Sequence, residues 1–92
     1  MPDIEIKRAH KLSTEEIKKR IEDTVRDLAT KFGLTWRWHD DHTVRFEGRG
    51  VKGELTHSAT EVAIRADLPF LMRPLKGAIV ERVEQKMAGL LG

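Results

Sequence analysis

Alternating polar and apolar residues mark five short segments of the chain as strands with one buried face. The first covers residues 3–7, where Ile4 and Ile6 fall on the same side of an extended chain. The same period of two returns later in the chain and predicts strands over residues 34–39, 42–47, 51–55 and 62–66.

Turn-forming residues separate the last four of these segments. They stand at positions 40–41 (Asp-Asp), 48–50 (Gly-Arg-Gly) and 58–60 (Ser-Ala-Thr). Because each connection is short, consecutive strands are expected to pair with each other as hairpins. The region from residue 34 to residue 66 is therefore predicted to form an antiparallel meander.

A helix is predicted to begin after Ser13. The Ser13 side chain can accept a hydrogen bond from the amide three residues on, while Glu16 can reach back and Leu12 can pack against Ile17. Gly33 suits the residue after the helix end, because glycine adopts positive φ without strain. The apolar residues between these ends span only about 80° of a helical wheel, a stripe that one sheet can cover. They are Ile17, Ile21, Val25, Leu28 and Phe32.

A second, C-terminal helix is predicted over residues 69–91, with Pro74 either inside its first turns or marking a break after a short preceding turn. Its apolar residues spread over about 200°, which is too wide for one contact. They are Leu71, Leu75, Ile79, Val80, Val83, Met87, Leu90 and Leu91. Either the helix is flanked by both the sheet and the first helix, or it leaves an apolar strip open to a partner.

Together these elements predict a single domain over residues 1–92, a length typical of one domain. The fold class is α+β, with two layers, an antiparallel sheet carrying two helices on one face, and the order β-α-β-β-β-β-α. This topology resembles a trimmed helix-grip domain, in which a long C-terminal helix lies across a curved sheet. In so small a core a shallow groove or a dimer seam is expected rather than an enclosed cavity.

Composition removes several classes of function. The chain has no cysteine, which excludes disulfides, thiolate zinc sites and cysteine nucleophiles. Seventeen Lys and Arg interleave with fifteen Asp and Glu, so nucleic acid is not the first partner expected. The longest apolar stretch, residues 68–72, is far shorter than a membrane span or a signal segment, so a cytoplasmic protein is expected.

Candidate catalytic and metal motifs have ordinary structural explanations. Gly48, Gly50 and Gly53 match the spacing of a dinucleotide-binding loop, but a strand rather than a helix follows them, which favours a hairpin turn and a small strand residue. The sequence from His39 to His42 offers four metal-ligand side chains, yet Asp-Asp is common turn chemistry and no second cluster completes a shell. No catalytic residue, cofactor or metal is expected, and the protein is not expected to be an enzyme.

The segment Trp36-Arg37-Trp38 indicates which side chains lie on each face of the sheet. Both tryptophans share the parity of Leu34, so they are expected on the apolar side, lining the core or a groove together with Phe46. A base-stacking sheet would need its aromatic residues on the exposed face. The opposite, solvent-facing side is predicted to carry Arg37, Arg45, Glu47, Lys52, Glu54 and Arg65.

Three stretches of the chain carry a family resemblance. They run from Asp3 to Leu12, from Val44 to Leu55, and from Phe70 through Leu75 to Ile79. On these stretches the sequence resembles the polyhydroxyalkanoic acid system family, small bacterial proteins associated with the genes of polyester storage granules. The resemblance implies a role near such granules and supplies no catalytic residues.

The function expected from these observations is that of a non-enzymatic accessory or regulatory protein of polyhydroxyalkanoate granule metabolism, located in the cytoplasm and at granules. The C-terminal helix and its entry segment would bind a granule surface, a lipid-like ligand or a granule protein. The expected binding residues are Trp36, Trp38, Phe46, Leu68, Phe70, Leu71, Met72, Val80 and Met87. The alternatives are a homodimerisation module, or a nucleic-acid-binding regulator that uses Arg37, Arg45, Arg49, Lys52 and Arg65.

Overall fold

A computed structural model describes residues 2–91 of the chain, and the side chains of residues 2–90. The sequence-based expectation that concerns the Leu91 side chain lies outside this part. In chain order the elements are β1 (Ile4–Ala9), α1 (Thr14–Phe32), β2 (Thr35–Asp40), β3 (Thr43–Gly48), β4 (Val51–His57), β5 (Glu61–Asp67), the 3-10 helix η1 (Phe70–Leu75) and α2 (Lys76–Leu91).

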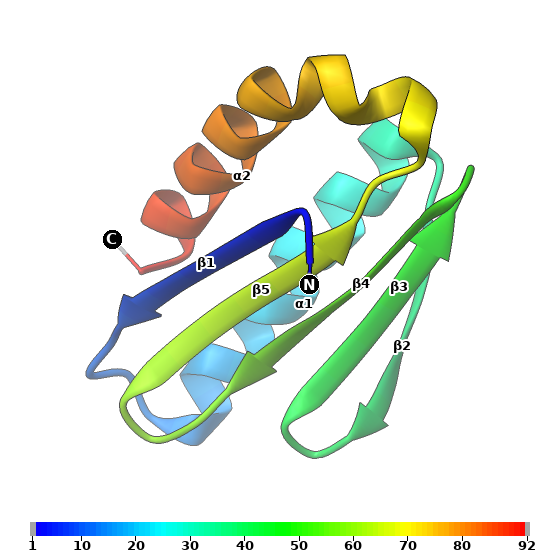
Figure 1. Cartoon of the computed structure of the whole chain (residues 1–92). Coiled ribbons are helices and arrows are strands. Elements are labelled where there is room, and N and C mark those ends of the chain that lie inside the picture. The colour runs from blue at the N-terminus through cyan, green and yellow to red at the C-terminus, as the bar shows by residue number, and fades with distance from the viewer. Residues whose placement is uncertain (1, 92) are drawn as a thin grey trace.

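All five strands form one antiparallel sheet in the order β1-β5-β4-β3-β2. The last four strands make the predicted meander, and β1 joins its far side by pairing with β5. In Figure 1, α1 passes behind this sheet and α2 runs along the β1 side. The predicted fold class, α+β with the order β-α-β-β-β-β-α, is therefore confirmed.

Helix α1 has the ends that its sequence predicts. The Ser13 Oγ accepts a hydrogen bond from the Glu16 amide at 3.2 Å, and Gly33 follows the helix with φ 69°. The Gly33 amide donates to the Ala29 carbonyl, which closes the last turn. The Glu16 carboxylate lies 3.9 Å from the Arg20 guanidinium, a helical neighbour one turn on.

The core lies between the helices and one face of the sheet. Alternate residues of the strands point into it, as the period of two predicts, and α1 contributes the fully buried Ile17 and Ile21. Helix α2 adds Val83, Met87 and Leu90, at i, i+4 and i+7. Because all of these side chains belong to one apolar cluster, both helices cover the same sheet face.

The chain after β5 divides into two helices. Residues 70–75 form η1, which contains Pro74, and the α-helix begins only at Lys76, so Pro74 marks the predicted break. A single helical wheel therefore does not apply from Leu71 onward, since a 3-10 helix has three residues per turn. Helix α2 packs against both α1 and β1, and the surplus of apolar surface is located in η1.

The three glycines with dinucleotide-loop spacing serve the β3–β4 hairpin. Arg49 and Gly50 both have positive φ, at 52° and 84°, as a tight two-residue hairpin turn requires. A Cβ on Gly53 would lie 2.5 Å from Cζ of Phe46, its partner on β3. The structural interpretation of these glycines is confirmed, and strand β4 follows the turn.

Candidate functional site

The exposed large apolar side chains of the described residues all lie in η1. Phe70 is 79% exposed, Leu71 86% and Leu75 57%. These three residues are called the η1 patch. Met72, between them in sequence, is half-buried and packs against the core. Figure 1 places η1, in yellow, at an outer corner of the molecule, beyond the end of β5.

The start of the chain holds the segment that leads into η1. The Asp3 carboxylate accepts a hydrogen bond from the Leu68 amide at 2.8 Å, and its other oxygen lies 4.0 Å from the Arg73 guanidinium. Leu68 itself is buried, and the Met72 amide donates to the Pro69 carbonyl at 2.9 Å. The η1 patch is thus displayed on a short helix that is fixed at its entry.

The charged residues in the segment that carries the patch are all basic. Between Asp67 and Glu81 there is no acidic residue, whereas Arg73 and Lys76 are both exposed. A partner of this segment therefore meets protruding apolar side chains flanked by two cations.

The structure separates the predicted binding residues into three groups. Phe70 and Leu71 are exposed, whereas Trp36, Trp38, Met72 and Val80 are half-buried. Phe46, Leu68 and Met87 belong to the core, and Met87 is only 1% exposed, so these three are not accessible to a partner. Of the predicted binding residues, the exposed ones thus lie in η1, whereas Met87 of α2 is buried.

Leu75 belongs to the patch but is missing from the predicted binding residues. Its signal in the sequence is its position after Pro74, where the 3-10 helix ends. A residue at this position follows the last strand of the meander and precedes the α-helix that packs on the core.

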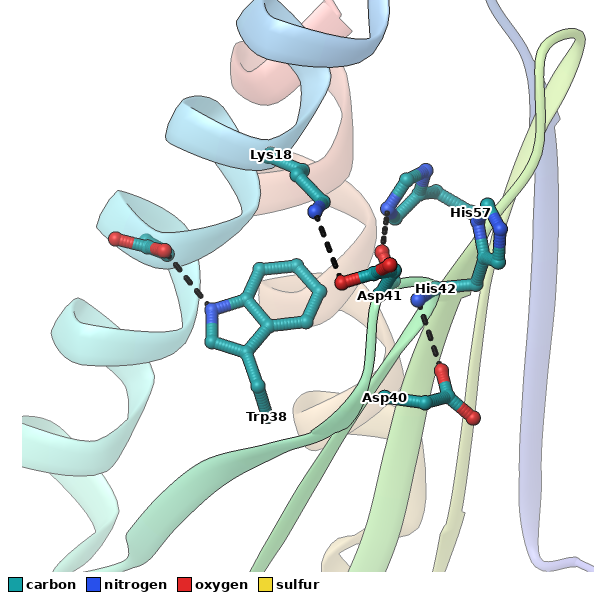
Figure 2. A network of polar contacts seen from close by, with 7 residues as sticks. Lys18, Trp38, Asp40, Asp41, His42 and His57 are labelled. Atoms are coloured by element: carbon teal, nitrogen blue, oxygen red, sulfur yellow. Dashed lines mark hydrogen bonds and ion pairs between the residues drawn. The ribbon is translucent and has the colours of Figure 1, made fainter.

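Trp38 is held by a tertiary network between α1 and the sheet (Figure 2). Its Nε1 donates to the Glu22 Oε1 at 2.8 Å, and the Lys18 Nζ lies 5.5 Å from the ring centroid. The ring meets His57 edge-on, with centroids 6.0 Å apart, and Lys18 also pairs with Asp41 at 3.7 Å. Trp38 therefore joins α1 to the strands and is not a free binding surface.

The His-Asp-Asp-His segment forms the β2–β3 connection. The Asp40 Oδ1 accepts a hydrogen bond from the His42 amide at 2.8 Å (Figure 2), and this bond holds the pKa of Asp40 below its usual range. Within residues 2–91, no three His, Asp or Glu side chains are placed to hold a metal ion. The interpretation of this segment as turn chemistry agrees with this geometry.

His57 is buried beside this connection. Burial lowers the pKa of His57, and the nearby His42, Lys18 and His10 act in the same direction. The hydrogen bond from the His57 Nε2 to the Asp41 carbonyl, at 2.9 Å, opposes the shift. His57 thus favours its neutral form and ties β4 to the β2–β3 connection.

The sheet face that the helices leave open forms a shallow trough. Its polar lining alternates in charge, because cross-strand neighbours of opposite sign follow one another over much of the sheet. The charged residues that line it are Arg37, Arg45, Glu47, Lys52, Glu54, Arg65 and Asp67. The predicted solvent-facing set is therefore gathered on one face, whereas Arg49 stands in the β3–β4 turn.

Fold and site together define a small two-layer α+β domain that displays an apolar segment at one corner and an open, charged sheet face. A family model described as "Putative polyhydroxyalkanoic acid system protein" matches residues 4–91. The chain belongs to this family, as the resemblance of its sequence implied. A search of curated proteins finds no match. No helix in the described part of the chain has the length and apolar character needed to cross a membrane.

Proposed function

We propose that this chain is a non-enzymatic accessory protein of polyhydroxyalkanoate granule metabolism that binds the polyester surface through the η1 patch. The observation that carries the proposal is the exposure of Phe70, Leu71 and Leu75 on one fixed six-residue helix. Membership of the polyhydroxyalkanoic acid system family supports the polyester as the partner. The protein would then work in the cytoplasm, at granules.

The size of the patch fits reversible adhesion. Burying a large apolar side chain contributes about 1.5–3 kcal/mol, so three partly exposed side chains offer roughly 3–7 kcal/mol before the costs of association. Even without those costs, about 7 kcal/mol corresponds to a dissociation constant on the order of 10 μM, so a single copy binds weakly. Many copies on one granule would still cover its surface.

The shape of the patch favours an extended apolar surface over a second copy of the chain. A stable protein interface buries about 800 Å² on each partner, which is more than three side chains on a short helix provide. Side chains that protrude from a corner can contact a broad surface without a complementary pocket. The cations Arg73 and Lys76 suit the carboxylate end groups and ester carbonyls of a polyester.

Co-sedimentation with protein-free polyhydroxyalkanoate particles tests the proposal. The double variant Phe70→Ser/Leu71→Ser should lose at least about tenfold in affinity for the particles, because it removes most of the exposed apolar area. The control is Ala78→Ser/Ala88→Ser, which places two serines at exposed positions of the neighbouring α2 and should bind like the wild type. Thermal unfolding establishes that both variants are folded.

A folded Phe70→Ser/Leu71→Ser protein that co-sediments as well as the wild type would refute the role of the η1 patch. Because the particles carry no protein, retained binding in the wild type also separates adhesion to the polyester from binding to a granule protein.

A further inference from the structure

The register of the sheet brings two arginines face to face on the open side. Arg37 of β2 pairs directly with Arg45 of β3. The same row continues across the sheet, from Arg45 to Glu54, from Glu54 to Arg65, and from Arg65 to Glu5. From β3 onward each neighbour has the opposite sign, so the row carries its surplus positive charge at the β2 edge.

This arrangement is unfavourable in the absence of an anion. Side chains directly opposite on one face have Cβ atoms about 4.5–5.5 Å apart, and like charges in such a pair destabilise the sheet. Arg65 has a carboxylate within reach, since its Nε lies 2.7 Å from the Glu5 Oε2. For Arg37 and Arg45, no ion pair is formed with any side chain of residues 2–90.

The neighbouring row contains two acidic residues and one basic residue. Glu47 stands next to this pair along β3, but its cross-strand partner is Lys52, which in turn pairs with Asp67. These three residues alternate in sign among themselves. Within these two rows Arg37 and Arg45 are thus the one cross-strand pair of like charge, and both line the trough.

We propose that Arg37 and Arg45 form a binding site for a small ligand that carries a carboxylate or phosphate group. Guanidinium groups are planar, stay charged at all physiological pH values and bind such oxyanions through paired hydrogen bonds. A group held between the two arginines replaces their repulsion with two attractive contacts. This site is on the open sheet face and does not depend on the proposed function of η1.

The charges around the arginines favour a small ligand over a nucleic acid. An extended phosphate backbone along the trough would approach Glu47, Glu54 and Asp67, whose charges repel it. A single oxyanion between Arg37 and Arg45 spans only β2 and β3, so it does not reach Asp67 on β5. The acidic residues would therefore restrict the site to short ligands.

NMR titration of the ¹⁵N-labelled chain at pH 7 tests this site, with inorganic phosphate and acetate added in separate series at constant ionic strength in chloride. Saturable shifts are expected for the Nε–Hε signals of Arg37 and Arg45, and saturation by phosphate or by acetate identifies the class of ligand. Arg37→Gln should weaken binding at least about tenfold, since it removes a charge-assisted contact. Lys19→Gln removes the same charge from the exposed side of α1 and should bind like the wild type.

Two further measurements make the proposal falsifiable. Arg37→Lys keeps the charge but not the planar fork, so it should also bind at least severalfold more weakly than the wild type. Linear, non-saturating shifts, or equal affinities for wild type, Arg37→Gln and Arg37→Lys, would overturn the site. Tight binding of a short single-stranded DNA that is lost in both Lys52→Gln and Arg65→Gln would overturn it in favour of nucleic acid.

Discussion

The Asp3 carboxylate accepts a hydrogen bond from the Leu68 amide at 2.8 Å, so a residue just before β1 fixes the chain just before η1. These two residues are 65 positions apart in the sequence. The contact depends on the pairing of β1 with β5, which places Ile4 opposite Ala66. The position of the η1 patch is therefore set by the first strand.

Replacing Asp3 by alanine should lower the free energy of unfolding by about 1–3 kcal/mol, the usual cost of losing a partly buried hydrogen bond to a charged group. Chemical denaturation measures this change. The control is Asp23→Ala, which removes an exposed ion pair with Arg26 on α1 and should change stability by about 0.5 kcal/mol or less. Equal effects of the two substitutions would contradict an anchoring role for Asp3.

Because Met87 is buried and Leu71 is exposed, alanine substitution should lower the stability of the fold much more at Met87 than at Leu71. Met87→Ala should destabilise the fold by about 2–5 kcal/mol, because it opens a cavity at a side chain that is almost completely buried. Leu71→Ala should change stability by no more than about 0.5 kcal/mol, since Leu71 is exposed. Thermal or urea unfolding of the two variants compares them. A large loss in Leu71→Ala would show that η1 packs against the domain in solution.

Gly53 and Gly89 should respond to alanine with opposite signs. A Cβ on Gly53 would lie 2.5 Å from the Arg65 carbonyl oxygen and from the Phe46 ring, so Gly53→Ala should destabilise the sheet by about 1–3 kcal/mol. At Gly89, inside α2, nothing lies within 4 Å of the added atom. Gly89→Ala should therefore stabilise the protein by about 0.5–1 kcal/mol, through helix propensity. Calorimetry measures the melting temperatures of these variants. A Gly53→Ala protein with the melting temperature of the wild type would contradict the close packing at β4.

Burial of His57 predicts a dependence of stability on pH. Because the pKa of His57 is lowered in the folded state, the unfolded chain binds the proton more tightly. The free energy of unfolding should thus fall as the pH drops from 6.5, the pKa of the unfolded state, through the lower pKa of the folded state. Above pH 6.5, His57 should not make the free energy of unfolding depend on pH.

Urea denaturation at several pH values, with NMR titration of the ring, measures this effect. His57→Gln should flatten the slope in that window, whereas His39→Gln, at an exposed position of β2, should leave it nearly unchanged. A ring titration midpoint above 6.5 in the folded protein would contradict the burial argument.

Much of the fold could be predicted because its signals are local. The alternation of Ile4 and Ile6 fixes which face of β1 is buried, and Ser13 and Gly33 mark the ends of α1 within the sequence around them. The hairpin at Gly50 likewise depends on backbone conformations that few other residues adopt. None of these features requires knowledge of a distant segment.

The site was harder to predict because it depends on helix type and on tertiary contacts. A wheel drawn from Leu71 assumes α-helical geometry, which begins only at Lys76, so it spread the apolar surplus along α2. The bond between Trp38 and Glu22 joins residues in different elements, so residue spacing within one element does not predict it. Such pairings become visible only when the elements are packed.

The sheet order also has a consequence for how the chain acquires its structure. Strand β1 lies beside β5, so β1 has no strand partner until β5 has been made. The four consecutive strands close through short loops and can assemble early, whereas docking β1 closes a long loop and is slower. Because the Asp3 side chain bonds to the Leu68 amide, the contact that anchors the entry to η1 forms only when β1 docks on β5.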